Sequence, residues 1–292
     1  MTWTLSAFAD EASQSVDEQI AVLKEAQIGC VDLRNVDGVN IVDLPVEHAK
    51  AVKEKLDAAG IAVGMYGSPI GKIDIADDFE TDRKRLTHLG ALREVFGAES
   101  VRLFSYFNKA NAEMGDWAEE SVRRLRELCE MAEDLGLVLY HENELGVFGG
   151  PLSQVEILRD EIHAQHPDRF RLIFDFDNYN QCGEDVWKNY QVLRESTHAI
   201  HLKESKRTAE GKYQHVPVGQ GDGRIEEILR DLASRKWEGQ LTLEPHLARS
   251  PAVVATGPHG EANASLADLS DVECFLVAAE AARGMLKRVG RL

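Results

Sequence analysis

Four side chains that commonly bind divalent metal ions stand at the ends of four consecutive apolar segments in the second half of the chain. Three are carboxylates and one is an imidazole: Glu142, Asp175, His201 and Glu244. Carboxylates gathered in a buried place repel one another, and a divalent cation removes that repulsion. The pattern therefore predicts one bound Mn²⁺, Mg²⁺, Co²⁺ or Zn²⁺, because three oxygen ligands and one nitrogen do not select one of these metals.

The segments that end in these residues belong to a repeat of short apolar runs and longer amphipathic stretches. The runs predict strands at residues 4–8, 30–34, 62–66, 100–104, 137–142, 170–175, 198–201 and 240–244. Nearly continuous apolar runs are typical of parallel strands buried on both faces. Helices are expected between them, among them residues 16–26, 46–59, 79–96 and 117–135, with a last helix at 271–287.

Eight strand–helix repeats predict a closed (β/α)₈ barrel, the TIM barrel, in a single domain over residues 1–292. The alternative is an open doubly wound sheet, which usually carries a GxGxxG turn after its first strand. No such turn occurs in this sequence. A barrel brings the carboxyl ends of its strands to one face, so the four candidate ligands are expected to meet there.

Other polar residues near the strand ends suit the binding of a small hydroxylated molecule. Lys72 follows the strand predicted at residues 62–66, and Arg102 lies in the strand predicted at 100–104. Lys203 comes two residues after His201, so the two side chains are expected on the same face of their strand. Lysine and arginine also form ordinary salt bridges at such positions, so a purely structural role for each of them stays open. Successive side chains of a strand point to opposite faces, so His141 faces away from Glu142 and is not expected to bind the metal.

Two long connections follow the last two strands, at residues 205–224 and 247–270. The second is rich in Ala, Pro, Gly and Ser, and a connection of this length is typical of a functional lid or a disordered segment. Both are expected on the face that carries the strand carboxyl ends.

Composition limits the classes of function. The net charge is −17, from 33 Lys and Arg against 50 Asp and Glu, which opposes binding to nucleic acid and to anionic membranes. No apolar run reaches the ~18 residues of a membrane helix, and no signal peptide is visible at the N-terminus. The four cysteines show no paired spacing, which is typical of reduced thiols. We therefore expect a cytoplasmic protein.

The motifs around the candidate ligands identify the chain as similar to the xylose-isomerase-like sugar isomerase/epimerase superfamily. The resemblance rests on Glu142-Asn143, Asp175 with Asn178, His201-Leu202-Lys203, the turn at residues 217–221, and Leu243-Glu244. It implies one metal ion held by Glu142, Asp175, His201 and Glu244, with the two glutamates also moving protons. It further implies substrate contacts from Lys72, Arg102, Asn178 and Lys203.

Ketohexose 3-epimerases of that superfamily have a histidine where this chain has Asn178, so free ketohexoses are not the expected substrate. The resemblance implies a sugar or keto-polyol isomerase or epimerase that works through a metal-bound enediolate. The alternatives are a dehydratase or lyase on an inosose or 3-keto-glycoside, and a non-catalytic sugar-binding barrel. An endonuclease IV-type repair enzyme is disfavoured by the charge and by the few histidines at strand ends. Relatives are often dimers or tetramers, so a homo-oligomer is expected.

Overall fold

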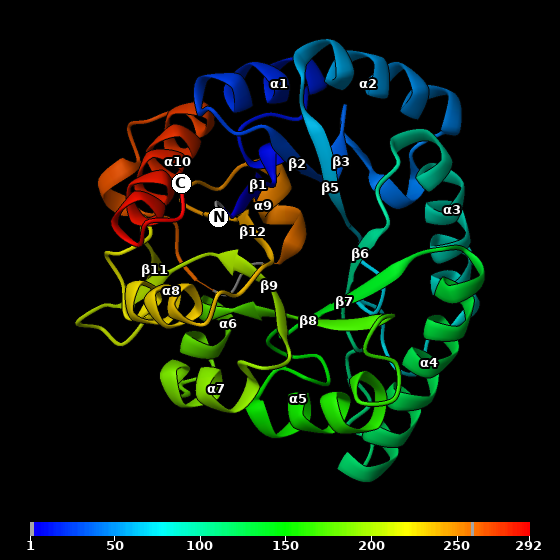
Figure 1. Cartoon of the computed structure of the whole chain (residues 1–292). Coiled ribbons are helices and arrows are strands. Elements are labelled where there is room, and N and C mark those ends of the chain that lie inside the picture. The colour runs from blue at the N-terminus through cyan, green and yellow to red at the C-terminus, as the bar shows by residue number, and fades with distance from the viewer. Residues whose placement is uncertain (1–2, 258–259) are drawn as a thin grey trace.

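A computed structural model describes residues 3–257 and 260–292 and shows a barrel of eight parallel strands surrounded by helices (Figure 1). The barrel strands are β1 (Thr4–Ala7), β2 (Cys30–Leu33), β5 (Ala62–Gly67), β6 (Ser100–Leu103), β7 (Val138–Glu142), β8 (Phe170–Asp175), β9 (Thr197–Leu202) and β12 (Gln240–Leu243). All eight strands lie within one or two residues of the predicted bounds. The prediction of a TIM barrel is confirmed.

The outer ring consists of helices that follow the strands in turn. They are α1 (Val16–Glu25), α2 (Val46–Ala59), α3 (Glu80–Phe96), α4 (Met114–Asp134), α5 (Leu152–Leu158) with the π-helical turn η3 (Arg159–His163), α6 (Phe176–Gln181), α7 (Val186–Leu193), α8 (Ile225–Ser234) and α10 (Asp271–Arg288). Their buried faces and the outer side of the sheet form the main apolar core. Gly60 and Gly97 end α2 and α3 in the left-handed conformation, as expected for glycine after a helix.

Inside the barrel, a small apolar cluster lies directly beneath the candidate metal ligands. It contains Tyr140, Ile173 and Ala199, which precede Glu142, Asp175 and His201 by two residues each, together with Met65 from β5. Side chains two apart in a strand point to the same face. The apolar layer therefore shows that the three polar side chains above it point into the barrel.

Hydrogen-bonded pairing runs from β1 through β12, β9, β8, β7, β6 and β5 to β2, so that β1 and β2 are the two ends of the sheet. Asp32 of β2 joins these ends, because its carboxylate accepts from Ser6 Oγ of β1 at 2.8 Å. The same carboxylate accepts from Gln240 Nε2 at 2.7 Å and from Thr242 Oγ1 of β12 at 2.6 Å. One buried side chain thus closes the barrel where backbone pairing ends.

The two long connections are more ordered than their composition predicts. Residues 205–224 contain a hairpin of β10 (Ser205–Arg207) and β11 (Tyr213–His215). Residues 247–270 contain α9 (Pro251–Thr256) and the turn η4 (Ala264–Leu266), while positions 258–259 lie outside the described residues. Ser250 caps α9 and Pro251 occupies its first turn, which are favourable choices at a helix start. Glu261 exchanges backbone hydrogen bonds with Tyr213 and His215, so the two connections pair with each other.

Three further short elements lie in the loops, namely η1 (Ala9–Glu11), η2 (Ile41–Asp43) and the hairpin of β3 (Asn35–Val36) and β4 (Val39–Asn40). Both described ends of the chain lie on the same face, where Trp3 N donates to Arg291 O (Figure 1).

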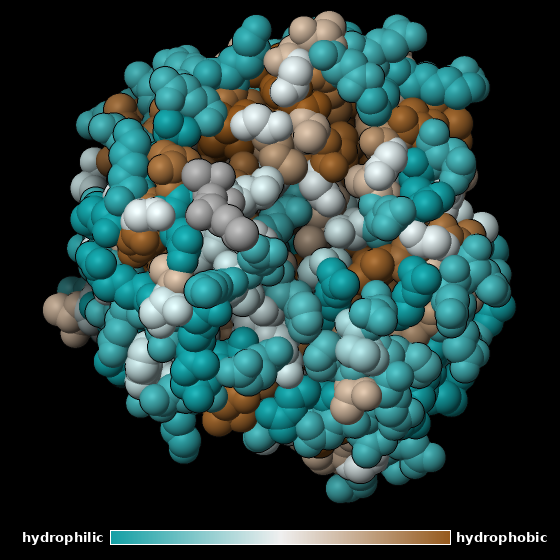
Figure 2. Space-filling model, in the orientation of Figure 1, coloured by the Kyte–Doolittle hydropathy of each residue, from teal (hydrophilic) through white to brown (hydrophobic). Residues whose placement is uncertain are grey.

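Hydrophilic side chains cover most of the surface seen in Figure 2, and hydrophobic residues show in the gaps between them. Among the described helices, none combines the length and the apolar character needed to cross a bilayer.

We expect Asp32→Ala to lower the free energy of unfolding by about 3 kcal/mol, because it leaves the buried donors of Ser6, Gln240 and Thr242 without an acceptor. Urea unfolding monitored by circular dichroism measures this change. Asp32→Asn, which keeps one carbonyl oxygen and the same shape, should lose less than half as much. An Asp32→Ala protein with the urea midpoint of the wild type would contradict this role.

Candidate functional site at the mouth of the barrel

The register of the sheet places the candidate ligands in one layer. Asp175 on β8 lies directly opposite His201 on β9, and His201 lies opposite Thr242 on β12, two residues before Glu244. Glu142 is the last residue of β7 and pairs with Ile173. Adjacent strands that end at one level therefore bring their last inward side chains together, as the sequence predicts.

His201 lies at the centre of this layer and faces three carboxylates. Its Nδ1 lies 3.0 Å from Glu142 Oε1, 3.0 Å from Glu244 Oε2 and 3.8 Å from Asp175 Oδ2. All four side chains are buried, and one ligand atom from each lies within 4.8 Å of the others. The structure thus brings together the four residues that the sequence singled out.

The backbone around Asp175 is fixed from two sides. Asn143 accepts from Asp175 N at 2.9 Å and donates to Asp175 O at 3.1 Å, which joins the ends of β7 and β8. Asp175 Oδ1 caps α6 by accepting from Asn178 N at 2.8 Å. Asp175 therefore serves as a helix cap through Oδ1 and leaves Oδ2 directed at the site.

Each of the two glutamates is shared between His201 and an arginine. Glu142 turns Oε1 to His201, while its Oε2 lies 3.3 Å from Arg102 Nη1. Glu244 turns Oε2 to His201, while its Oε1 accepts from Arg34 Nη1 at 2.8 Å. Both guanidinium groups also lie over the ring of Phe8, at 4.6 Å for Arg34 and 4.8 Å for Arg102. The orientation of both carboxylates is therefore fixed.

Electrostatics show a local excess of negative charge. Burial alone would lower the pKa of His201, yet the carboxylates of Glu142 and Glu244 raise it to about 10. Burial likewise disfavours a charged lysine, but Asp175 and Glu244 raise the pKa of Lys203 well above its usual value. Burial raises the pKa of Asp175 well above that of an exposed aspartate. Without a metal ion, protons take up part of the charge that a divalent cation would balance.

The donor set and its unsatisfied atoms fit a divalent cation. Among the described residues, Asp175 Oδ2 and Glu244 Oε2 accept no well-aligned hydrogen bond, although both are buried. Buried carboxylate oxygens without such donors are costly unless a cation or a proton meets them. Three carboxylates and one imidazole in contact distance of a common point match the ligands used for Mn²⁺, Mg²⁺, Co²⁺ and Zn²⁺.

The residues predicted to contact substrate line one small cavity above this group. It has a volume of about 20 Å³, and Lys72, Arg102, Asn178 and Lys203 all contribute to its wall. Lys203 Nζ lies 3.0 Å from Asp175 Oδ2, and Asn178 Nδ2 lies 3.4 Å from Glu142 Oε1. Lys72 stands at the outer end, where it pairs with Glu144 at 2.8 Å and lies 3.5 Å from Thr256 O.

Other features that the sequence marked lie outside the cavity. His141 bonds Ser105 Oγ at 2.8 Å and does not join the carboxylate group. The glycine-rich turn after residue 217 wraps the buried carboxylate of Glu204, which accepts from Gly219 N at 2.6 Å and Gly223 N at 3.2 Å. A Cβ at Gly221 would lie 2.4 Å from Ser205 O, so this turn needs glycine for packing.

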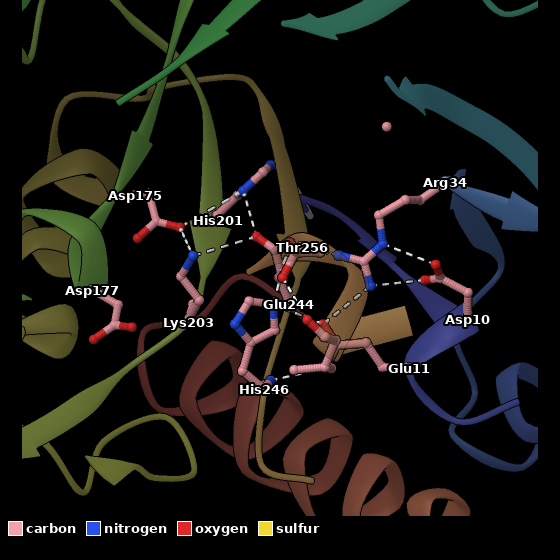
Figure 3. A network of polar contacts seen from close by, with 12 residues as sticks. Asp10, Glu11, Arg34, Asp175, Asp177, His201, Lys203, Glu244, His246 and Thr256 are labelled. Carbon is pink, nitrogen blue, oxygen red and sulfur yellow. Dashed lines mark hydrogen bonds and ion pairs between the residues drawn. The ribbon is translucent and has the colours of Figure 1, made fainter. Parts of the chain in front are cut away.

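Several residues at the site had no assigned role in the sequence analysis. Arg34, Asp10 and Glu11 form a charged cluster against Glu244, and His246 lies beside it (Figure 3). His215 packs edge-on against His246, with ring centroids 5.3 Å apart. Asp10-Glu11 and Arg34-Asn35 come shortly after β1 and β2, and their pairing depends on the barrel bringing β1 beside β2. His215 belongs to the hairpin of a long connection, and no periodicity in the sequence points to it.

A larger groove lies elsewhere, on the outside of the helical ring. It has a volume of about 1060 Å³ and is lined by α4 residues such as Glu119, Glu127 and Arg123, with Arg83 and Glu161. These side chains are paired with one another at the surface, for example Arg123 with Glu127 at 3.0 Å. Buried groups with strongly shifted pKa values gather at the barrel mouth instead, so the mouth is the better candidate site.

Comparisons with known proteins agree with this fold. A family model described as xylose isomerase-like TIM barrel matches residues 20–267. Fructoselysine 3-epimerase from Escherichia coli O157:H7 is 28% identical over 148 residues, which are 48% of this chain and 48% of that enzyme. The match therefore spans about half the length of this curated relative.

Solved structures share the fold at low identity. A structure of the IOLI protein with a binding zinc atom superposes with a TM-score of 0.72, at 13% identity and with 99% of each chain covered. A probable 3-DHS dehydratase from Bacillus anthracis gives a TM-score of 0.64, at 18% identity, over 84% of this chain and 92% of that one. At these identities the two structures show that the fold is shared.

We expect Asp175→Asn to weaken the binding of Mn²⁺ to metal-freed protein by at least ~100-fold, because it removes a charged oxygen ligand while keeping the side chain's shape. Isothermal titration calorimetry measures the affinity. Asp177→Asn is the matched control, since Asp177 is buried two residues later and lies outside the ligand group. Equal Mn²⁺ affinity for Asp175→Asn and the wild type would exclude Asp175 as a ligand.

Proposed function

The chain belongs to the xylose isomerase-like TIM barrel family, and we propose that it is a metal-dependent isomerase or epimerase of a sugar or keto-polyol. The observation that carries this proposal is the pair of buried glutamates, Glu142 and Glu244, on either side of His201. Each has one oxygen held by an arginine and one directed into the site. Two fixed carboxylates beside a cation site are what proton transfer next to a carbonyl requires.

Glu142, Asp175, His201 and Glu244 would hold the ion. A bound divalent cation would act as a Lewis acid that offsets the negative charge developing when a C–H bond beside a carbonyl is broken. One glutamate takes this proton and the other returns a proton to the substrate. Return to the same carbon from the opposite side gives epimerisation, and return to the neighbouring carbon gives isomerisation.

His201, together with Arg102 at Glu142 and Lys203 at Glu244, keeps the two glutamates ionised. Burial raises the pKa of Glu142, but His201 and Arg102 outweigh this effect and lower it to about 2. Burial raises the pKa of Glu244 as well, and Lys203 with His201 brings it well below its usual value. Both carboxylates are therefore ionised at neutral pH, so each is able to accept a proton.

The wall of the cavity favours a hydroxylated substrate. Besides Glu244 it presents amides, ammonium groups and imidazoles, among them Asn178, Gln181, Lys72 and His215. These groups donate and accept hydrogen bonds, which hydroxyl groups satisfy. The charge of Lys72 is already balanced by Glu144, and that of Lys203 by Asp175, so a neutral polyol suits this wall better than a phosphorylated sugar.

Substrate entry requires the residues that cover the cavity, Thr256 and Gly257 among them, to move. The present volume of about 20 Å³ holds roughly one water molecule, whereas ligand pockets commonly measure ~300–1,000 Å³. Thr256 and Gly257, at the end of α9, form the outer wall opposite Lys72. The hydrogen bond from Lys72 Nζ to Thr256 O is long, at 3.5 Å, so its loss costs little when the cover opens.

Elimination from an inosose or 3-keto-glycoside is the second candidate, because it begins with the same proton abstraction. His215 lines the cavity, and its Nδ1 lies 3.3 Å from Asp177 Oδ2. A carboxylate in this position orients an imidazole that protonates a leaving hydroxyl. The similarity in fold to a probable dehydratase is consistent with this option. A non-catalytic sugar-binding barrel has no need for two buried bases, so it is the weakest alternative.

We expect Glu142→Gln and Glu244→Gln each to lower the rate of solvent-deuterium exchange at the carbon beside the substrate carbonyl by at least ~1,000-fold, since each removes a base. Proton NMR in deuterated buffer with Mn²⁺ measures this exchange across a panel of keto-sugars, inososes and 3-keto-glycosides. Retained deuterium in a stereoisomer or positional isomer identifies epimerisation or isomerisation. A conjugated product that absorbs in the ultraviolet identifies elimination.

The matched control is Glu99→Gln, a surface substitution next to Arg93, which should exchange at the wild-type rate. Circular dichroism confirms that each variant is folded. Full exchange by both glutamate variants would rule out the two-base reaction.

A further inference from the structure

A second group of potential ligands lies beside the candidate metal site and shares Glu244 with it. It consists of Glu11, Glu244 and His246, whose ligand atoms lie within 4.8 Å of one another. His246 Nε2 lies 3.4 Å from Glu11 Oε1 and 3.6 Å from Glu244 Oε1. This nitrogen is buried and makes no well-aligned hydrogen bond among the described residues. Two carboxylates with a free imidazole nitrogen have the composition of a cation site.

The guanidinium of Arg34 contacts both carboxylates of this second set of ligands. Arg34 Nη1 donates to Glu244 Oε1 at 2.8 Å, and Nη2 lies 3.4 Å from Glu11 Oε1. Asp10 holds the guanidinium in a fork, with Nε to Oδ2 at 2.8 Å and Nη2 to Oδ1 at 3.0 Å. Figure 3 shows Arg34, Asp10 and Glu11 together on one side of Glu244, opposite Asp175 and Lys203.

We propose that Arg34 is a built-in cation that takes the place of a second divalent ion in the group of Glu11, Glu244 and His246. The barrel mouth then accepts one ion, and Glu244 offers that ion only Oε2, because Arg34 holds Oε1. The inference rests on the proposed metal site formed by Glu142, Asp175, His201 and Glu244.

The charge around Arg34 distinguishes this role from that of an ordinary salt bridge. One carboxylate is enough to pair a guanidinium, whereas Arg34 contacts Asp10, Glu11 and Glu244, all of them buried. Removal of the guanidinium leaves three carboxylates close together and shielded from water. Such a place attracts a divalent cation, since like charges at this distance disfavour one another.

Metal-freed wild type and Arg34→Met are compared by titration with Mn²⁺. We expect one ion per chain in the wild type and two in Arg34→Met, measured by isothermal titration calorimetry. Two Mn²⁺ ions that share Glu244 should also broaden the six-line electron paramagnetic resonance signal that a single ion gives. Mn²⁺ should raise the melting temperature of Arg34→Met by more than that of the wild type, since two bound ions stabilise the folded state more than one.

The matched control is Arg34→Lys, which keeps a positive charge and should bind one ion. Arg34→Met combined with His246→Ala should return to one ion, because the second group loses its imidazole. If Arg34→Met fails to fold, Arg34→Gln replaces it with the same expectation. One ion in both the wild type and the folded neutral variants overturns the inference and leaves the first metal site standing. No bound ion in any protein overturns the metal site itself and this inference with it.

Discussion

The constraint on which the rest of the site depends is the balance of buried charge at the barrel mouth. Six carboxylates lie there with little exposure to water: Asp10, Glu11, Glu142, Asp175, Asp177 and Glu244. Three permanent cations face them: Arg34, Arg102 and Lys203. The carboxylates therefore outnumber the permanent cations. Burial, only partly offset by Arg34, raises the pKa of Glu11 to about 8, as expected where negative charge is not fully compensated.

The barrel tolerates this concentration of charge because its apolar cores lie away from its mouth. The helices and the outer side of the sheet form one apolar core, and the inner layer beneath the site is apolar as well. Register then places the last inward residue of each strand at a common level. The free energy of folding thus comes from the apolar cores outside the sheet and beneath the site. These cores hold the carboxylates at the mouth close together against their mutual repulsion.

The sequence was sufficient to predict the barrel and the grouping of four residues at its mouth, because both follow from local pattern. These residues are Glu142, Asp175, His201 and Glu244. Apolar runs located all eight strands, and the strand parity of Glu142 and His141 separated the residue that faces the site from its neighbour. The surrounding contacts depend on distant parts of the chain. Arg34 reaches Glu244 across 210 positions, and the partners of Asp32 come from both ends of the barrel. No local pattern carries such pairings. The order within residues 247–270 was also missed, since its capped helix is too short to show periodicity.

Charge balance also bears on the kind of molecule that the site accepts. The proposed divalent ion would offset part of the negative charge of the carboxylates, and the outer pair of Lys72 and Glu144 is neutral by itself. Arg102 and Lys203, which also line the described cavity, are each engaged by a buried acid and are not left over for a phosphate or a second carboxylate. An anionic substrate would have to displace one of these contacts and leave a carboxylate unpaired. A neutral hydroxylated substrate displaces none, so the proposed function favours a neutral sugar or polyol over a charged sugar.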